Sequence, residues 1–370
     1  MNQRPRAFAA TAVASRAALV WLAAGCAAPN RSVVAGGPTG AGGSAPAPSG
    51  LPIPPGSGGA SRPSGTPGHL TVLDWAGFKS AVSFTFDDSQ PSHIEHYAEL
   101  QAVGVPMTFY INAGHNSAAS FDATWTQAAK DGHELGNHTA HHCHADLTGC
   151  GVGAALADPA AEIDANTAYI THHYPQSAVW TMASPYGDTG WSLPAQASHF
   201  INRGVGNGTI APNGTADPFN LPVHMALTGE TASRFNAVTD AARAAGHWLI
   251  FVIHTISPTT VTWYNPVGIA EVTGGMRHPR SLGDVWIDTV ASVGAYWRGQ
   301  KAFSAATPVV AGDQTTWTWA LPAHFPAGKF LRVKVDGGTL TQGAGGAPLA
   351  WSDHGYYEIA LDAGTLTLAP

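Results

Sequence analysis

SFTFDDS, residues 83–89, closes an apolar run on two adjacent aspartates, Asp87 and Asp88. The run begins at Ser80 and has the length and composition of a buried strand. Catalytic side chains of parallel α/β barrels emerge from the carboxyl ends of strands. The two aspartates are therefore candidates for a functional site, although a plain turn after a strand would also explain them.

GNHTAHH, residues 136–142, is a second polar motif and places His138 and His142 four positions apart. One carboxylate and two imidazoles make a ligand set for a divalent metal that leaves coordination positions open for water and substrate. The other aspartate is then available for chemistry beside the metal. A solvated, histidine-rich turn is the competing interpretation.

Apolar or β-branched runs recur along the chain and alternate with segments that carry helix signals. Strands and helices that alternate at this spacing predict parallel βαβ units, in a barrel or in an open sheet. The predicted fold class is α/β, with a distorted (β/α) barrel favoured, and His254 also ends an apolar run. The apolar runs span residues 80–86, 107–111, 178–182 and 248–253, and the helical segments span 91–104, 120–132, 158–174, 231–246 and 281–299.

Beyond about Gly299 the pattern changes to an alternation with period two. Segments such as FLRVKVDGG, residues 330–338, alternate between glycine-bearing turns. They predict a small C-terminal antiparallel β domain over residues 301–370, after a barrel over residues 68–300. Trp317, Trp319 and Trp351 suit carbohydrate binding, but packing against the barrel is the commoner fate of such aromatic residues.

The first 26 residues have the character of an export signal, because arginines precede a short apolar stretch at 17–24. The segment LAAGC, residues 22–26, resembles the lipobox of bacterial lipoproteins, which implies lipid attachment at Cys26. Residues 27–67 are mostly Gly, Pro, Ser and Ala, and predict a disordered linker. We expect an exported protein, either a lipoprotein of the bacterial cell envelope anchored through Cys26 or a secreted one.

Cys143 and Cys150 form an even pair in a chain predicted to be exported. An oxidising compartment and a short intervening loop favour a disulfide between them. Such a loop, directly after His142, would stiffen a metal ligand, and a purely structural staple explains it equally well.

Charged residues make up only 11% of the chain, and the formal net charge is −7. The 17 Lys and Arg residues are thinly spread, which is a poor electrostatic footprint for a phosphate backbone. Nucleic acid is therefore not an expected partner, and the composition suits a neutral extracellular substrate.

Four features follow one another along the chain: SFTFDDS, GNHTAHH, SPYG at residues 184–187, and the apolar run that ends at His254. Over about residues 70–299 the chain resembles the polysaccharide deacetylase family, the NodB-homology carbohydrate esterases. The resemblance implies a distorted (β/α) barrel, one divalent metal and hydrolysis of N-acetyl or O-acetyl groups on a polysaccharide or oligosaccharide. Zinc is the favoured ion, with cobalt and manganese as alternatives, and we expect a monomer.

The resemblance implies a division of roles among the polar residues. It assigns Asp87 as the general base and Asp88, His138 and His142 as the metal ligands. Chemistry requires the same division, because a carboxylate bound to a metal loses basicity and a separate one must accept the proton from water.

Two further residues take part in the chemistry that the resemblance implies. The backbone N–H of Tyr186, in SPYG, would stabilise the charge on the carbonyl oxygen. His254 would act as the acid that protonates the leaving group. A simple turn at SPYG and a structural histidine are the competing interpretations.

The chain departs from the family at Ala183, where members commonly have an arginine that holds the base. Arg203, in INRGVG, is a candidate substitute for that partner of Asp87.

The acidic residue that orients the histidine acid in the family is also not identified by the motifs. Asp188 and Asp217 are both candidates for orienting His254. Trp191 lines the acetyl pocket or belongs to the core.

The main hypothesis is a metal-dependent enzyme that removes acetyl groups from a carbohydrate polymer. A non-catalytic glycan-binding protein on the same fold is an alternative. A non-haem iron oxygenase is less favoured: two histidines and a carboxylate suit ferrous iron, but such enzymes place a histidine and a carboxylate close together and the second histidine far away. The sequence leaves open the glycan, the choice of amide or ester, and the native metal.

Overall fold

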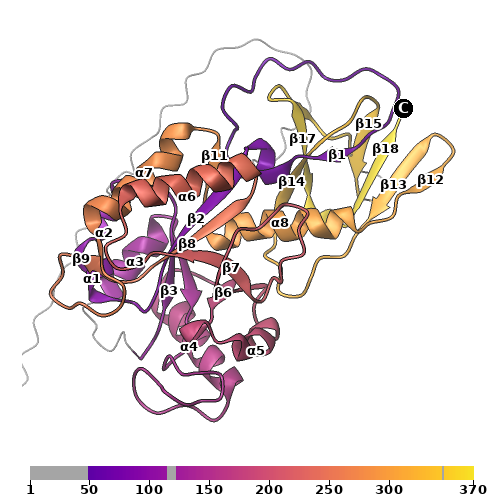
Figure 1. Cartoon of the computed structure of the whole chain (residues 1–370). Helices are drawn as coiled ribbons and strands as arrows, with labels where there is room; N and C mark the ends of the chain where they lie inside the picture. Colours follow the sequence, from indigo (N-terminus) through magenta and orange to yellow (C-terminus); the bar gives the residue numbers. More distant parts are fainter. Residues whose placement is uncertain (1–48, 115–121, 344–345) are drawn as a thin grey trace, which may run out of the picture. The chain divides into compact units, whose positions relative to one another are not determined.

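The computed structural model describes residues 49–114, 122–343 and 346–370 (Figure 1). Among these residues, seven parallel strands close into a ring. Neighbours in the ring follow chain order from β2 to β8, and β8 returns to pair with β2 along residues 81–86. The predicted α/β class and distorted barrel are therefore confirmed. The ring strands are β2 (Ser80–Phe86), β3 (Thr108–Ile111), β4 (Glu134–Asn137), β5 (Thr181–Ala183), β6 (Ile201–Asn207), β7 (Leu221–Met225) and β8 (Trp248–Ile253).

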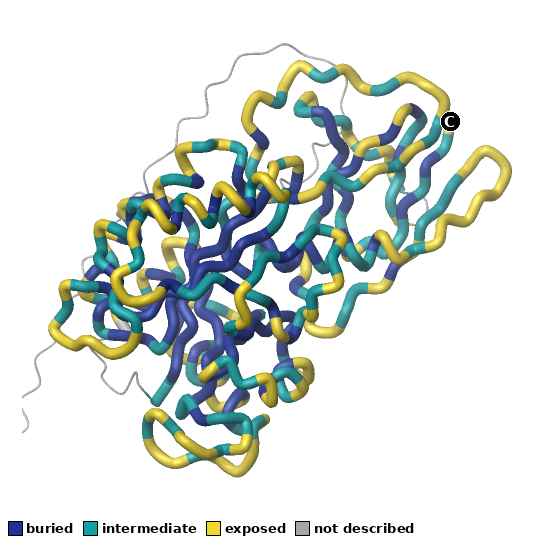
Figure 2. Tube along the Cα trace, viewed as in Figure 1, coloured by how far each residue is buried: buried dark blue, intermediate teal, exposed yellow. Residues whose placement is uncertain are grey.

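The ring is distorted at β2, whose second edge is shared by two strands. Its first half pairs with β11 (Val285–Ile287), and its last two residues pair with β3. Every residue of β2 and β8 is buried (Figure 2). Burial on both faces explains why these two strands read as continuous apolar runs in the sequence.

Strand β4 escaped sequence prediction because its residues ELGN look like a turn. Glu134 is buried and accepts hydrogen bonds from the hydroxyl groups of Thr108 and Thr181 on the neighbouring strands. Gly136 leaves room for the Tyr110 ring, since a Cβ there would lie 2.4 Å from a ring carbon. The polar and small residues of β4 thus serve the interior of the barrel.

Helices surround the ring (Figure 1), and most predicted helical segments contain one. The predicted helix over 281–299 is wrong in its bounds, because β11 separates α7 from α8. Helix α7 was missed because Gly274, Gly275 and Pro279 weaken its signal, yet Gly275 allows close packing on α6, where a Cβ would lie 2.6 Å from Phe235. The helices are α1 (Pro91–Glu95), α2 (Tyr97–Gln101), α3 (Asp122–Lys130), α4 (Pro159–His173), α5 (Ser192–Gln196), α6 (Ala232–Ala245), α7 (Ile269–Leu282) and α8 (Val290–Ser304).

An ion-pair cluster lies where β2 and β11 begin. Asp284 accepts two hydrogen bonds from Arg243, at 2.7 and 2.5 Å, and lies 2.9 Å from Lys79 Nζ. Hydrogen bonds from Arg243 and the charges of both cations lower the pKa of Asp284 to about 2.

The C-terminal region forms two antiparallel sheets of four strands, as the alternation predicted. Trp317 and Trp319 pack on Phe303 of α8, and Trp319 is buried in the shared hydrophobic cluster. One sheet has the order β1 (Thr71–Val72), β14 (Phe330–Lys334), β17 (Tyr356–Ala360) and β16 (Trp351–Ser352); the other has β12 (Val309–Ala311), β13 (Gln314–Thr318), β18 (Thr365–Ala369) and β15 (Thr339–Gln342).

Residues 49–67 differ from the expectation of a free linker. Arg332 donates to the carbonyl oxygen of Pro52 at 2.7 Å, and Trp351 Nε1 donates to that of Ala60 at 2.8 Å. Side chains of the C-terminal sheet thus supply hydrogen-bond donors to backbone carbonyl groups of this segment. The export signal, Cys26 and the rest of the linker lie outside the described residues. Within the described ranges, no helix has the length and apolar character needed to cross a membrane.

Candidate active site and metal centre

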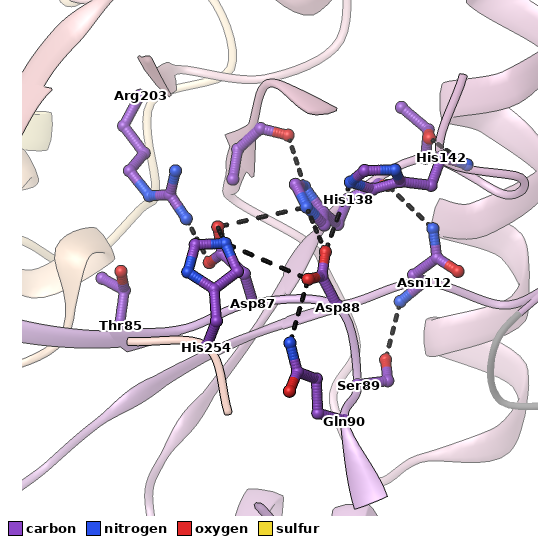
Figure 3. A network of polar contacts seen from close by, with 12 residues as sticks. Thr85, Asp87, Asp88, Ser89, Gln90, Asn112, His138, His142, Arg203 and His254 are labelled. Carbon is purple, nitrogen blue, oxygen red and sulfur yellow. Dashed lines mark hydrogen bonds and ion pairs between the residues drawn. The ribbon is translucent and has the colours of Figure 1, made fainter. Parts of the chain in front are cut away.

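The polar residues singled out from the sequence meet at the carboxyl ends of the ring strands (Figure 3). Asp87 and Asp88 follow β2, His138 follows β4 and His254 follows β8. Parallel strands deliver the residues that follow them to one edge of the barrel, so segments far apart in sequence form one site.

Backbone strain is concentrated at this edge. Asp88, Thr139, His142 and Tyr186 have φ values of 72°, 61°, 51° and 56°, in the left-handed region that disfavours side chains. Such conformations cost about 1–3 kcal/mol each and persist where the surrounding structure enforces them. Their clustering here is typical of a functional site.

Asp88, His138 and His142 form a group that can hold a metal ion. The Nε2 atoms of both histidines lie 3.2 Å from Asp88 Oδ1, and one ligand atom from each residue falls within 4.8 Å of the others. A carboxylate with two imidazoles suits zinc and related divalent ions. The predicted ligand set is thus brought together.

Groups behind the ligands fix their orientation. His138 Nδ1 lies 2.8 Å from the carbonyl oxygen of Ala183, which can only accept, so Nδ1 carries the hydrogen and Nε2 is left for a metal. Gln90 Nε2 donates to Asp88 Oδ2 at 3.2 Å. Buried Gln90 was not identified from the sequence, where no pattern marks a lone glutamine as a partner of a ligand.

Asp87 is held apart from this group by Arg203. The guanidinium Nη2 donates to Asp87 Oδ1, and both side chains are buried. Arg203 on β6 pairs in register with Ala183 on β5, so the cation stands one strand away from the position where the family has its arginine. The predicted contact between Arg203 and Asp87 is confirmed. Its guanidinium also lies over the Tyr110 ring, 4.8 Å from the centroid.

The electrostatics of the site favour ionised carboxylates. Burial raises the pKa of Asp87, but Arg203, His138 and His254 outweigh it and lower the pKa below its ordinary value. Burial also raises the pKa of Asp88, and hydrogen bonds from His138 and His142 lower it well below the usual range.

His254 lies beside the two carboxylates without a close hydrogen bond to either. Its Nε2 is 3.9 Å from Asp87 Oδ2 and 4.0 Å from Asp88 Oδ2. Burial lowers its pKa, and the carboxylates only partly offset that effect. Its Nδ1 is buried and has no hydrogen-bond partner among the described residues.

Neither acidic candidate orients His254. Asp188 accepts from the backbone N–H groups of Ala145 and Gly190, and Asp217 accepts from that of Phe219. Asp188 thus serves its own turn and also contacts the disulfide loop at Ala145, and Asp217 serves its own turn.

The predicted disulfide joins Cys143 to Cys150, with an S–S distance of 2.01 Å. Tyr186 donates its hydroxyl to the carbonyl oxygen of Gly149 in that loop, at 2.7 Å. Its ring meets the imidazole of His142 edge-on, with centroids 4.5 Å apart. Trp191 is fully buried and donates to the carbonyl oxygen of Cys143, so it belongs to the core.

A cavity of about 390 Å³ opens onto these residues. The two carboxylates and three histidines line it, together with Tyr186, Tyr264, Met225 and Val205. Its size suits a ligand larger than a single ion.

These observations define a (β/α) barrel protein with three residues placed so that they can hold a metal ion and a separate buried aspartate at the carboxyl edge of the strands. Residues 77–199 match the family described as polysaccharide deacetylase. The match confirms the resemblance to this family over residues 77–199. The match includes the three metal-binding residues, Asp87 and Tyr186, and ends before Arg203 and His254.

Solved structures with related descriptions show low similarity. A polysaccharide deacetylase structure from Mycobacterium smegmatis has 14% identity and a TM-score of 0.43, covering 65% of this chain and 95% of its own. A family 4 acetyl xylan esterase from Clostridium thermocellum, in complex with cobalt, has 16% identity and a TM-score of 0.36, covering 58% and 89%. A CE4 family pseudoenzyme from Bacillus anthracis has 12% identity and a TM-score of 0.39, covering 63% and 69%. No curated protein matches the chain.

Proposed function

We propose that this protein is a metal-dependent hydrolase that removes acetyl groups from an extracellular carbohydrate polymer. The observation that carries the proposal is the division between the two adjacent aspartates. Asp88 lies with the two histidines, whereas Asp87 is ion-paired to Arg203 and faces the same cavity. A carboxylate that is not a metal ligand is free to accept a proton from water, as hydrolysis requires.

The residues fit a divalent metal. Asp88, His138 and His142 would hold it, and the hydrogen bond from His138 Nδ1 to a carbonyl supports ligation through Nε2. Zinc is favoured by the mixed oxygen and nitrogen donors, with cobalt or manganese as alternatives. When bound, the ion supplies Lewis acidity toward the acetyl carbonyl and lowers the pKa of water.

The side chains around the metal group divide the proton transfers between them. Asp87 accepts the proton of the attacking water, and its low pKa ensures that it is ionised at neutral pH. His254, whose Nε2 lies near both carboxylates, donates a proton to the departing nitrogen or oxygen. The backbone N–H of Tyr186 donates to the carbonyl oxygen as charge develops there.

We also infer that the protein acts outside the cytoplasm. The disulfide supports an oxidising compartment, and the character of residues 1–26 supports export, with lipid anchoring at Cys26 or secretion as the two forms.

Acetate release tests the proposed function. N-acetylated chito-oligomers, peptidoglycan and acetylated xylan are incubated with the protein, with chelator-treated protein, and with treated protein to which zinc is restored. The assays are run without oxygen. We expect acetate release from at least one substrate, loss of this activity after chelator treatment, and its recovery when zinc is restored. Release that needs oxygen would support an oxygenase, and binding of a glycan without release would support a non-catalytic protein.

A further inference from the structure

The segment after His254 presents aromatic side chains to solvent beside the cavity. It runs between two short parallel strands, β9 (Ile256–Ser257) and β10 (Val267–Gly268). Within it, Trp263 is 42% exposed and Tyr264 is 53% exposed. Tyr264 lines the cavity, and its ring meets the His254 imidazole edge-on, with centroids 4.9 Å apart. A large ring held half-exposed at a cavity wall is available to a ligand.

A chain of hydrogen bonds connects the backbone at this aromatic ring to the metal-binding group. Gln90 donates to Asp88 Oδ2, and the Thr255 hydroxyl donates to Gln90 Oε1 at 2.7 Å. The same hydroxyl accepts from the backbone N–H groups of Trp263 and Tyr264, each at 3.1 Å. Gln90 and Thr255 are buried, and the bond between them is buried as well, whereas the other three bonds are partly buried.

The two exposed tyrosines of the cavity have different neighbours. Tyr186 packs on His142, and Tyr264 packs on His254. In Figure 3 these two histidines lie on opposite sides of Asp88. The acetyl carbonyl belongs on the side of Tyr186, whose backbone N–H serves as its donor, and the leaving group belongs beside His254, which protonates it.

We propose that Tyr264 binds the sugar ring that carries the departing nitrogen or oxygen, with its phenol ring against the apolar face of a pyranose. This inference rests on the proposed function, because it identifies the leaving-group side through His254. The ligand class is a neutral hexose or pentose ring within an oligosaccharide. Aromatic side chains supply such contacts at low cost in conformational entropy.

Binding of oligosaccharides to chelator-treated protein tests the inference without turnover. The probes are N-acetylated chitopentaose and acetylated xylopentaose, titrated by calorimetry. The variants are Tyr264→Ala, Tyr264→Leu, which keeps apolar bulk without a flat ring, and Tyr264→Phe, which keeps the ring. The matched control is Leu193→Ala, which truncates a side chain that is 76% exposed and does not line the cavity.

Loss of the ring is expected to raise Kd about tenfold in the alanine and leucine variants, with the phenylalanine variant and the control within about twofold of wild type. In the kinetic assay KM should rise by the same factor while kcat and zinc affinity stay unchanged. Unchanged Kd in both ringless variants would overturn the inference, as would a fall in kcat at constant KM, which would assign the ring to holding His254. Binding of neither probe by wild type would also overturn it. A wild type that binds a probe through Tyr264 but releases no acetate would refute the proposed hydrolase and leave only the sugar contact at Tyr264 standing.

Discussion

Replacing Arg203 with methionine should move the pH dependence of catalysis, because this cation favours the ionised form of Asp87, the proposed base. Arg203 and Asp87 are 0% and 2% exposed, so water cannot replace the lost partner. Two unit charges about 4 Å apart interact by about 4 kcal/mol at an effective dielectric constant of about 20. That is an upper bound of about three pKa units. His138, His254 and a bound metal offset part of it, so we expect the pKa of Asp87 to rise by about one to two units.

The sign follows from the role of the base. Asp87 accepts a proton only when ionised, so activity is lost as pH falls through its pKa. Raising the pKa of Asp87 therefore moves the acid limb of the kcat/KM profile to higher pH by about one to two pH units. Loss of one partner from a buried ion pair should also lower the free energy of unfolding by about 3–5 kcal/mol.

The assay measures kcat/KM for acetate release at saturating zinc from about pH 4 to about pH 9. Carboxylate and imidazole groups titrate within about this range. Arg203→Lys keeps the charge and should shift the acid limb less. The double variant Ala183→Arg with Arg203→Ala puts the cation on the register partner and should restore part of the wild-type profile. An acid limb that stays in place in Arg203→Met, with only stability reduced, would refute the reasoning.

Three further predictions concern groups around the site and the barrel. Gln90→Leu removes a hydrogen bond to Asp88 and should weaken zinc binding about tenfold or more, measured by competition with a zinc indicator; unchanged affinity would show that this bond does not orient the ligand. Joint Cys143→Ser and Cys150→Ser substitution should lower the free energy of unfolding in urea by about 2 kcal/mol, because the open loop regains chain entropy, and an unchanged midpoint would contradict this. Asp284→Asn should cost about 1–2 kcal/mol at neutral pH after allowance for solvent screening. Because the folded pKa of Asp284 is about 2 and its ordinary value is 3.8, this difference should shrink as pH falls from the ordinary value to the folded one; a constant difference would assign the effect to packing.

Sequence patterns predicted the barrel where the buried strands carry mainly apolar or β-branched side chains. Strands β2 and β8 are continuous apolar runs, and their ends carry Asp87, Asp88 and His254. Strand β4 was missed because Glu134 and Gly136 serve contacts with other strands, which a local pattern does not contain. Local sequence patterns therefore identified the strands whose side chains are mainly apolar or β-branched.

The site could be predicted where its residues lie in short motifs. The metal-binding group comes from two such motifs, and the resemblance assigned its members. Arg203 was found only as a candidate, because its contact with Asp87 depends on the pairing of β5 with β6. Gln90 and Tyr264 were not found, since their roles depend on hydrogen bonds and ring contacts made across the folded chain. Asp188 and Asp217 were wrong candidates for orienting His254, because a local sequence pattern does not show which groups their carboxylates contact in the folded chain.

Metal content tests the central claim most directly, because the division between Asp88 and Asp87 makes opposite predictions for two variants. Wild type, Asp87→Asn and His138→Ala are dialysed against zinc, and bound ion is measured together with acetate release. Wild type and Asp87→Asn should each bind one ion per chain, His138→Ala should bind none, and both variants should be inactive. A His138→Ala variant that keeps the ion, or an Asp87→Asn variant that loses it, would contradict the account.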